Sequence, residues 1–423
     1  MQNLPLFKDN KERRVFFIII FLVFLFNIYN EYTNFTKFKT NEIYETKGTI
    51  VNSYSKENYL ILKIKTKNFT FFTSTQQKSQ FFKFQNINIY VVTQNIDFYS
   101  YLKGFYTKSF NLTIIKHDKT LKESLIQLIE SQHSSKEIAS LYSALFLASS
   151  LDPSIRELAS NLGISHLIAI SGFHLGLISF VLYFILHLLY NKVHNSLVPY
   201  RNKRFDIMII VTIILFTYLL FLDLPASLLR AFVMFVFALF LLRCNIKLIS
   251  FETLFIITIF IIALFPKLLF SLSLWFSIAG VFYILLFLKY FKGMNKYLQL
   301  LIFNFWIYLA INPIVHYFFA TTSLEQLFSP LITILFTLFY PISVLLHMVN
   351  LGGFFDGLLQ YLINLDIISS ETFTPLWVFL IYLLISFFST LKKEFFILLN
   401  IYIIVYNMWL FQSTFKEYLF IWI

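Results

Sequence analysis

From residue 166 onward the chain consists largely of apolar runs long enough to cross a lipid bilayer. A helix needs about 20 apolar residues to span about 30 Å of hydrocarbon, and in lipid its backbone polar groups must be paired internally. The candidate spans cover residues 166–190, 205–222, 225–242, 248–265, 268–288, 298–318, 328–349, 375–391 and 394–411. These runs predict a polytopic α-helical membrane protein.

The composition supports this prediction. Of the 423 residues, 58% are hydrophobic and 13% are charged, and the mean hydropathy is +0.71. A soluble domain has about 45–50% apolar and about 25% charged residues, so this chain lacks the polar surface needed to dissolve. Its single cysteine, Cys244, excludes an intramolecular disulfide bond.

Residues 1–30 are predicted to form a membrane anchor. Basic residues at 11–14 precede an apolar run at 15–26, and no small-residue cleavage site follows, so we expect an uncleaved helix with a cytoplasmic N-terminus. Further basic clusters follow alternate spans, as a single cytoplasmic side requires. The cluster at 392–393 fits this pattern only if residues 350–374 contain a crossing or re-entrant piece.

Residues 31–118 are polar and show short alternating runs typical of strands. Within residues 59–67, three lysines share one face of a strand and two aliphatic side chains share the other. They are Lys63, Lys65 and Lys67 on the first face and Leu62 and Ile64 on the second. Several such strands predict a small β-rich domain, which the anchor helix would deliver outside the cytoplasm.

Residues 119–165 include two stretches with leucine and isoleucine at helical spacing. We expect amphipathic helices that lie on the outer membrane face or pack under the β-rich domain. The remainder, residues 166–423, forms the polytopic transmembrane domain.

Polar residues gather in residues 162–177, LGISHLIAISGFHLGL, which we call the signature segment. It contains two of the 8 histidines and three of the 10 glycines of the chain. Polar side chains at membrane depth usually face a pathway or a partner, and glycines spaced by four allow close helix packing. The candidates for lining or gating a pore are His166, Ser171, Gly172, His174 and Gly176.

Other roles for these side chains remain open. Each histidine can instead lie at the interface or bond to a backbone carbonyl. Ser171 and His174 can meet at helical spacing and form a nucleophile pair, although no third group is evident. No carboxylate lies nearby to complete a metal site, so neither a metal nor a cofactor is expected.

The sequence HLIAISGFHLGL, residues 166–177, closely resembles the signature of the ComEC competence family, whose members pass single-stranded DNA into the bacterial cytoplasm. Three further segments resemble motifs of the same family: residues 224–243, 265–282 and 311–332. The resemblance adds Ser227, Arg230, Ser273 and Ser277 to the candidates for lining the pore.

This chain departs from the family pattern at two places. Leu274 and Trp275 stand where the family has Phe-Gln, and residues 148–150 lack the usual acidic residue. A metallo-β-lactamase-like domain, which longer members carry at the C-terminus, is absent from this sequence. The resemblance therefore implies a short form of the family.

The resemblance implies a non-enzymatic channel in the bacterial inner membrane that translocates single-stranded DNA during natural transformation. The β-rich domain would adopt an oligonucleotide-binding-like (OB-like) fold, with basic and aromatic side chains contacting DNA: Lys63, Lys65, Lys67, Lys83 and Phe82. No phosphate-binding ATPase loop occurs, so we expect a periplasmic DNA receptor and cytoplasmic motor or DNA-binding proteins as partners. The channel can also be a homo-oligomer.

Two other classes of function compete with the channel. An intramembrane hydrolase would use Ser171 with a histidine. A small-molecule transporter would show inverted repeats and charged midplane residues, and few of either occur in the sequence.

Overall fold

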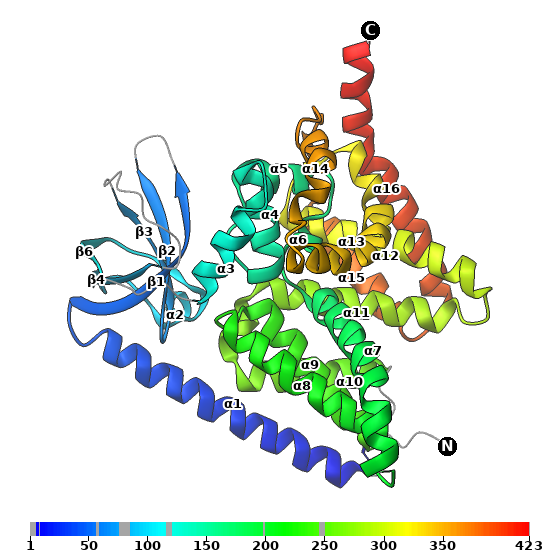
Figure 1. Ribbon diagram of the computed structural model, residues 1–423, viewed down its shortest axis with the longest axis horizontal. Helices are drawn as coiled ribbons and strands as arrows, with labels where there is room; N and C mark the ends of the chain where they lie inside the picture. The colour runs from blue at the N-terminus through cyan, green and yellow to red at the C-terminus, as the bar shows by residue number, and fades with distance from the viewer. Residues whose placement is uncertain are drawn as a thin grey trace. The chain divides into compact units, whose positions relative to one another are not determined.

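The computed structural model describes residues 6–7, 9–55, 59–75, 85–115, 121–197, 199–244 and 250–422. The chain divides into two compact units (Figure 1). The first contains the described residues up to 124 together with 255–275. The second contains the described residues of 125–254 and 276–423 that remain.

The first unit contains a closed six-stranded sheet, ordered β5-β3-β2-β1-β4-β6. Its strands are β1 (Ile43–Ser55), β2 (Leu60–Thr66), β3 (Thr70–Thr75), β4 (Asn86–Val92), β5 (Phe105–Tyr106) and β6 (Ser109–Ile114). β5 runs parallel to β3 and β6 antiparallel to β4. In the link from β5 to β6, the Thr107 N–H donates to the carbonyl of Phe72 on β3 at 2.9 Å. The segment 105–114 thus joins both ends of the sheet into a small barrel, and the OB-like fold stays a prediction.

The barrel core follows the predicted alternation. Leu62 and Ile64 are completely buried, whereas Lys65 and Lys67 are exposed. Gly48 on β1 is required by close packing, because a Cβ there would lie 2.6 Å from Cγ2 of Ile64. The β-rich region predicted from alternation is therefore present.

The first helix, α1 (Asn10–Phe38), continues eight residues past the predicted end of the anchor at residue 30. It begins at Asp9, whose side chain accepts from the Glu12 N–H. Its middle exposes apolar side chains such as Phe21 and Phe26, whereas Phe38 at its end is buried in the barrel core. The same helix therefore offers an apolar surface to lipid and closes the barrel.

The second unit is helical. It contains α4 (Lys136–Leu147), α5 (Pro153–Asn161), α6 (Ser165–Ile168), α7 (Gly172–Leu197), α8 (Lys203–Phe221), α9 (Ala226–Arg243), α12 (Lys296–Phe318), α13 (Ser329–Met348), α14 (Asp356–Ile363), α15 (Leu376–Ser389) and α16 (Lys393–Trp422). Three further helices include residues of both units: α3 (Leu121–Glu130), α10 (Phe251–Leu264) and α11 (Leu272–Tyr290).

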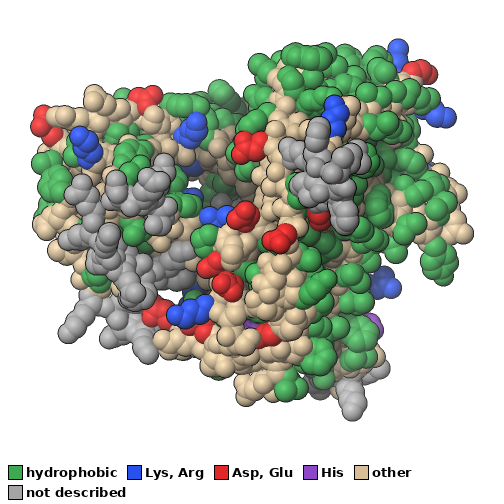
Figure 2. All heavy atoms as spheres, turned by 90° about the horizontal axis from the view of Figure 1, so that it is seen from above, with side chains coloured by type: hydrophobic (Ala, Val, Ile, Leu, Met, Phe, Trp, Pro, Cys, Tyr) green, Lys and Arg blue, Asp and Glu red, His purple; other side chains and the backbone are tan. Residues whose placement is uncertain are grey.

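Seven helices of the described chain are long and apolar enough to cross a membrane. Their outward side chains are apolar, including Phe180 (69% exposed) and Leu338 (67% exposed), and hydrophobic side chains cover much of the surface in Figure 2. Soluble proteins rarely expose so large an apolar surface to water. The chain is a polytopic helical membrane protein with a small N-terminal β-sheet region.

Helix α4 lies inside the helical core. Tyr142 and Leu145 are almost completely buried, and they share one hydrophobic cluster with residues of α7, α8 and α13. Its amphipathic pattern predicted a helix at the membrane surface or under the β-rich domain. The pattern identified the helix but not the buried position, because periodicity does not reveal what covers the apolar face.

A second hydrophobic cluster joins α11, α12, α15 and α16. Two side-chain hydrogen bonds fix the register of α12 against α16. Asn312 Nδ2 donates to Asn407 Oδ1 at 2.6 Å, and Trp306 Nε1 donates to Asn400 Oδ1 at 2.7 Å. In lipid, such bonds between helices are a source of specificity because the tails offer no alternative partners.

Residues 350–374 form a return segment, which leads from the C-terminal end of α13 back toward its N-terminal end. After α13, a short 3₁₀ helix, η3 (Gly352–Phe355), and α14 lead back to β8 (Ser370–Glu371). β8 pairs with β7 (Thr321–Thr322), which is separated from the start of α13 by the 3₁₀ helix η2 (Leu324–Phe328). The chain therefore retraces α13, although α14 is only about 12 Å long.

This return reconciles the charge pattern near the C-terminus. Lys289 Nζ at the end of α11 donates to the Thr390 carbonyl at 2.7 Å. The basic residues 392–393 therefore lie at the same end of the helices as Lys289, as a single cytoplasmic side requires.

Candidate functional site

The signature segment is a broken helix. Residues 165–168 form the short helix α6, residues 169–171 are not helical, and α7 begins at Gly172. The sequence predicted one continuous span from residue 166. The structure instead places the start of the long helix six residues later.

Ser171 and His174 cap the start of α7. The Phe173 N–H donates to Ser171 Oγ at 3.3 Å, and the Ser171 N–H donates to His174 Nδ1 at 3.3 Å. This reciprocal pattern is a capping box, with histidine in the position usually held by glutamate or glutamine. Ser171 Oγ also lies 3.2 Å from His174 Nδ1.

His174 is completely buried, between the rings of Phe336 and Tyr340. Because its Nδ1 accepts a backbone hydrogen bond, the hydrogen-bond pattern assigns the proton of the neutral ring to Nε2. Among the described residues, Nε2 has no hydrogen-bond partner.

The second family motif, residues 224–243, contacts the chain at this break. Ser227 Oγ on α9 donates to the Ile170 carbonyl at 2.7 Å, which satisfies a backbone group freed by the missing helical turn. Close by, a Cβ on Gly172 would lie 3.4 Å from Cβ of Ala231 on α9. Gly172 therefore supports close helix packing, whereas Gly176 faces open space and does not.

The fourth motif holds the chain just before the signature segment. Ser323 Oγ donates to the Asn161 carbonyl, Ser329 Oγ to the Gly163 carbonyl at 3.0 Å, and Gln326 Nε2 to the Ser160 carbonyl at 3.1 Å. Gly163 has a φ of +65°, a conformation that glycine adopts most readily. Side chains from two distant motifs thus bond to backbone carbonyls on either side of α6.

The side chain of His166 is exposed. Arg230, one turn into α9, is 4% exposed. Burying a charged arginine in an apolar helix costs free energy, so such a residue is a candidate for a functional role.

The third motif is divided between the two units. Ser273 lies in the first unit and is exposed, and Ser277 lies in the second and is half-buried. The predicted role of these two serines in lining a pore stays a prediction.

The sequence analysis missed a buried polar cluster formed by His133, His347 and Asp356. His133 Nδ1 lies 2.8 Å from Asp356 Oδ1, and its Nε2 lies 3.0 Å from His347 Nε2. The other carboxylate oxygen accepts from the N–H and hydroxyl of Ser134, at 3.0 and 3.2 Å. His347 Nδ1 donates to the Ser343 carbonyl at 2.7 Å.

Three hydrogen bonds link the Ser343 carbonyl, His347, His133 and Asp356 in series. His133 lies more than 200 residues from both His347 and Asp356 in the chain. The local signal is the glycine-rich stretch at 352–357, which contains Asp356 and follows an apolar helix.

The basic face of the barrel carries Lys63, Lys65 and Lys67. Lys63 Nζ lies 5.5 Å from the ring centre of Phe72, whereas Phe69 and Phe71 are buried in the core. Phe82 and Lys83 lie outside the described residues.

The family model described as Competence protein matches residues 147–415. The chain belongs to the ComEC/Rec2 family of competence proteins. No curated protein and no solved structure matches the chain. The matched region begins at the last residue of α4 and includes all of the signature segment, α9 and the return segment 350–374.

Membership assigns this competence protein a role in DNA uptake. The bonded frame around α6, from Asn161 to Ile170, lies within the matched region.

Proposed function

We propose that this competence protein is an inner-membrane channel that passes one DNA strand into the cytoplasm. The observation that carries the proposal is the broken helix of the signature segment, around which backbone carbonyls accept hydrogen bonds from Ser227, Ser323 and Ser329. Irregular backbone at membrane depth is tolerated where it is buried in protein or lines a water-filled cavity. His166, exposed on the short helix α6 within this segment, would face such a cavity.

The chemistry of this lining suits a polyanion. A neutral imidazole at His166 would offer hydrogen bonds without a fixed charge. A channel must bind its substrate weakly enough to release it. A neutral lining would let phosphates pass, and Arg230, on the adjoining helix α9, would supply a positive potential that draws them in.

The frame around α6 would keep the passage open. Ser227, Ser323 and Ser329 bond to carbonyls on both sides of this short helix. These bonds satisfy the backbone without a continuous helix, which is how irregular backbone is tolerated at membrane depth.

The barrel would present DNA from the outer side, with the N-terminus in the cytoplasm. Exposed Lys65 and Lys67 would follow phosphates, and the Phe72 ring beside Lys63 would stack on a base. The sequence has no ATPase loop, so a cytoplasmic motor and a periplasmic receptor would complete the system, and the channel itself would be non-enzymatic.

Cysteine accessibility tests whether His166 is in water. In a Cys244→Ser background, which has no other cysteine, His166→Cys should react rapidly with a charged methanethiosulfonate reagent, and single-stranded DNA should slow the reaction. Phe180→Cys is the matched control, because Phe180 on α7 is 69% exposed but would face lipid. Equal rates at the two positions would refute the proposed cavity.

Transport itself is tested by following labelled transforming DNA in a strain that lacks this gene. We expect DNA to accumulate outside the cytoplasm while cytoplasmic entry is lost. Normal cytoplasmic entry in that strain would refute the channel even if His166 is wet.

The contact of Ser171 with His174 favours a hydrolase as the second candidate. Ser171→Asn separates the two roles, because asparagine is a good N-cap but no nucleophile. A structural cap predicts that Ser171→Asn keeps most of the transformation frequency and that Ser171→Ala loses about 1 kcal/mol of stability. Complete loss in both variants, with normal amounts of folded protein, would support the enzyme.

A further inference from the structure

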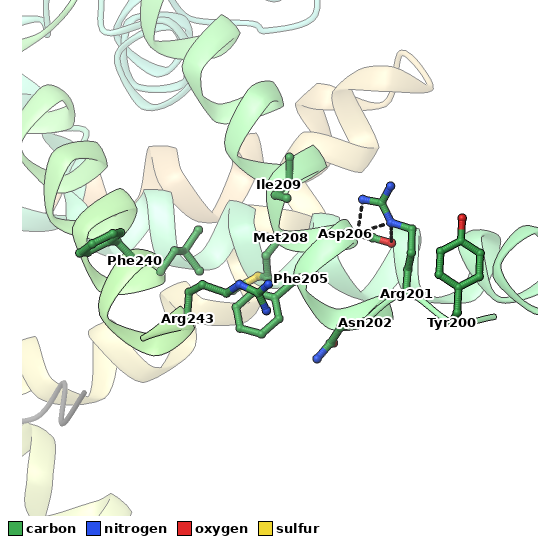
Figure 3. A pocket seen from close by; sticks show the side chains of 10 residues that line it. Tyr200, Arg201, Asn202, Phe205, Asp206, Met208, Ile209, Phe240 and Arg243 are labelled. Carbon is green, nitrogen blue, oxygen red and sulfur yellow. Dashed lines mark hydrogen bonds and ion pairs between the residues drawn. The ribbon is translucent and has the colours of Figure 1, made fainter. Parts of the chain in front are cut away.

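A pocket of about 620 Å³ lies between the start of α8 and the end of α9. Its polar end is formed by Tyr200, Arg201, Asn202 and Arg243, and its apolar side by residues that include Ile209 and Phe240 (Figure 3). None of these residues belongs to the signature segment or to the frame around α6.

The charges in the pocket do not cancel. Arg201 is paired with Asp206 through its Nε and Nη2 atoms at 2.7–3.2 Å, so the two groups neutralise each other. Arg243 is exposed, and its guanidinium lies 5.0 Å from the ring centre of Phe205. No ion pair among the described residues includes Arg243, so the pocket keeps a positive charge.

The polarity of the lining changes along the helix axis. Arg243 is the last residue of α9, and Leu239 and Phe240 lie one turn earlier. On α8, Phe205 is followed one turn later by Ile209, which is 54% exposed. A cationic mouth at the helix ends therefore leads to an apolar wall at hydrocarbon depth.

We propose that this pocket binds one anionic phospholipid. Arg243 would hold the phosphate beside the Asn202 amide, and an acyl chain would lie along Ile209 and Phe240. Basic pockets between membrane helices on the cytoplasmic side are suited to anionic headgroups. The bound lipid would fasten the α8–α9 hairpin to that leaflet.

The apolar wall distinguishes a lipid from other phosphate ligands. Inorganic phosphate or a DNA phosphate would use the arginine but leave Leu239 and Phe240 without a partner. The acyl chain of a phospholipid covers both side chains while the headgroup stays beside the arginine.

Native mass spectrometry of the purified full chain tests the proposal. The protein in detergent is titrated with palmitoyl-oleoyl-phosphatidylglycerol or with the matching phosphatidylcholine. We expect the first phosphatidylglycerol to bind more tightly than phosphatidylcholine, and Arg243→Gln to weaken it about fivefold, which corresponds to about 1 kcal/mol per basic residue.

Arg204→Gln is the matched control, because Arg204 is exposed at the same helix end but does not line the pocket. The affinity of the Arg204→Gln variant for phosphatidylglycerol should stay within about twofold of the wild-type affinity. An equal loss in both variants would reduce the effect to general surface charge and overturn the proposal. Displacement of the lipid by millimolar inorganic phosphate, or by a short oligodeoxythymidine, would also overturn it.

Discussion

Gly352 occupies a position where the fold leaves no room for a side chain. A Cβ there would lie 2.6 Å from Gln132 Oε1 and 2.8 Å from both Cδ2 and Nε2 of His347. Real Cβ atoms do not approach other atoms so closely, so Gly352→Ala must displace two side chains. Both are held by other bonds: Gln132 Oε1 accepts from the Gly352 N–H at 3.0 Å, and His347 bonds to His133.

The cost follows from these contacts. Overpacking a buried site costs about 1–3 kcal/mol, and loss of the bond between Gln132 and the Gly352 N–H adds about 0.5–1.5 kcal/mol. We therefore expect Gly352→Ala to lower the free energy of unfolding by about 2–4 kcal/mol. The loss would be larger if His347 moved away from His133, because that would break the series of bonds to Asp356.

Gly357 provides a matched control five residues away. It lies in α14, and a Cβ there would meet nothing within 4 Å. Alanine is a better helix former than glycine by up to about 1 kcal/mol. Gly357→Ala should therefore leave the stability unchanged or slightly raised.

The assay is unfolding of both variants and the wild type in mixed detergent micelles, followed by circular dichroism against the mole fraction of the denaturing detergent. We expect an earlier transition for Gly352→Ala alone. Equal stability of Gly352→Ala and Gly357→Ala would refute the close packing of Gly352 against Gln132 and His347.

Two further predictions concern carboxylates. Asp356→Ala removes the acceptor of His133 Nδ1 and of the Ser134 N–H and hydroxyl, which should cost about 1–3 kcal/mol, and the same micelle assay should show a loss beyond that of Glu137→Ala on α4. Asp97 caps α2 (Phe98–Lys103), and its bonds from the side chain and N–H of Ser100 lower its pKa from the ordinary value of 3.8. Its contribution is therefore present above that value and lost as the pH falls through the lowered pKa. Asp97→Asn should match the wild type at pH 7 and lack this loss in acid, as measured by the unfolding midpoint across the pH range, and identical acid profiles would contradict the assignment.

The helical membrane class was readable from the sequence because lipid demands long apolar runs. The break in the signature segment could not be read from the sequence. Ser171 and His174 were recognised as a pair that could meet on a helix, but a histidine is an unusual third residue in a capping box, so a cap was not predicted. The bond from Ser227 to Ile170 could not be predicted either, because it joins backbone and side chain 57 residues apart.

The histidine cluster shows a different limit. His133 stands in a polar turn between two amphipathic helices, and Asp356 stands in a glycine-rich stretch that no periodicity explains. Local patterns indicate the secondary structure of a segment, and they carry no information about a partner more than 200 residues away. The position of α4 was misjudged for the same reason, since its covering helix α13 comes almost 200 residues later.

The distance between His133 and Asp356 along the chain also has a consequence for biogenesis. At about 5–20 residues per second of synthesis, the ribosome needs roughly 10 to 45 s to make the 223 residues that separate them. During that time the turn at 131–135 is already made while its carboxylate does not yet exist. The nascent protein must therefore keep a histidine and the apolar face of α4 in a provisional environment, which gives membrane chaperones a defined interval in which to act.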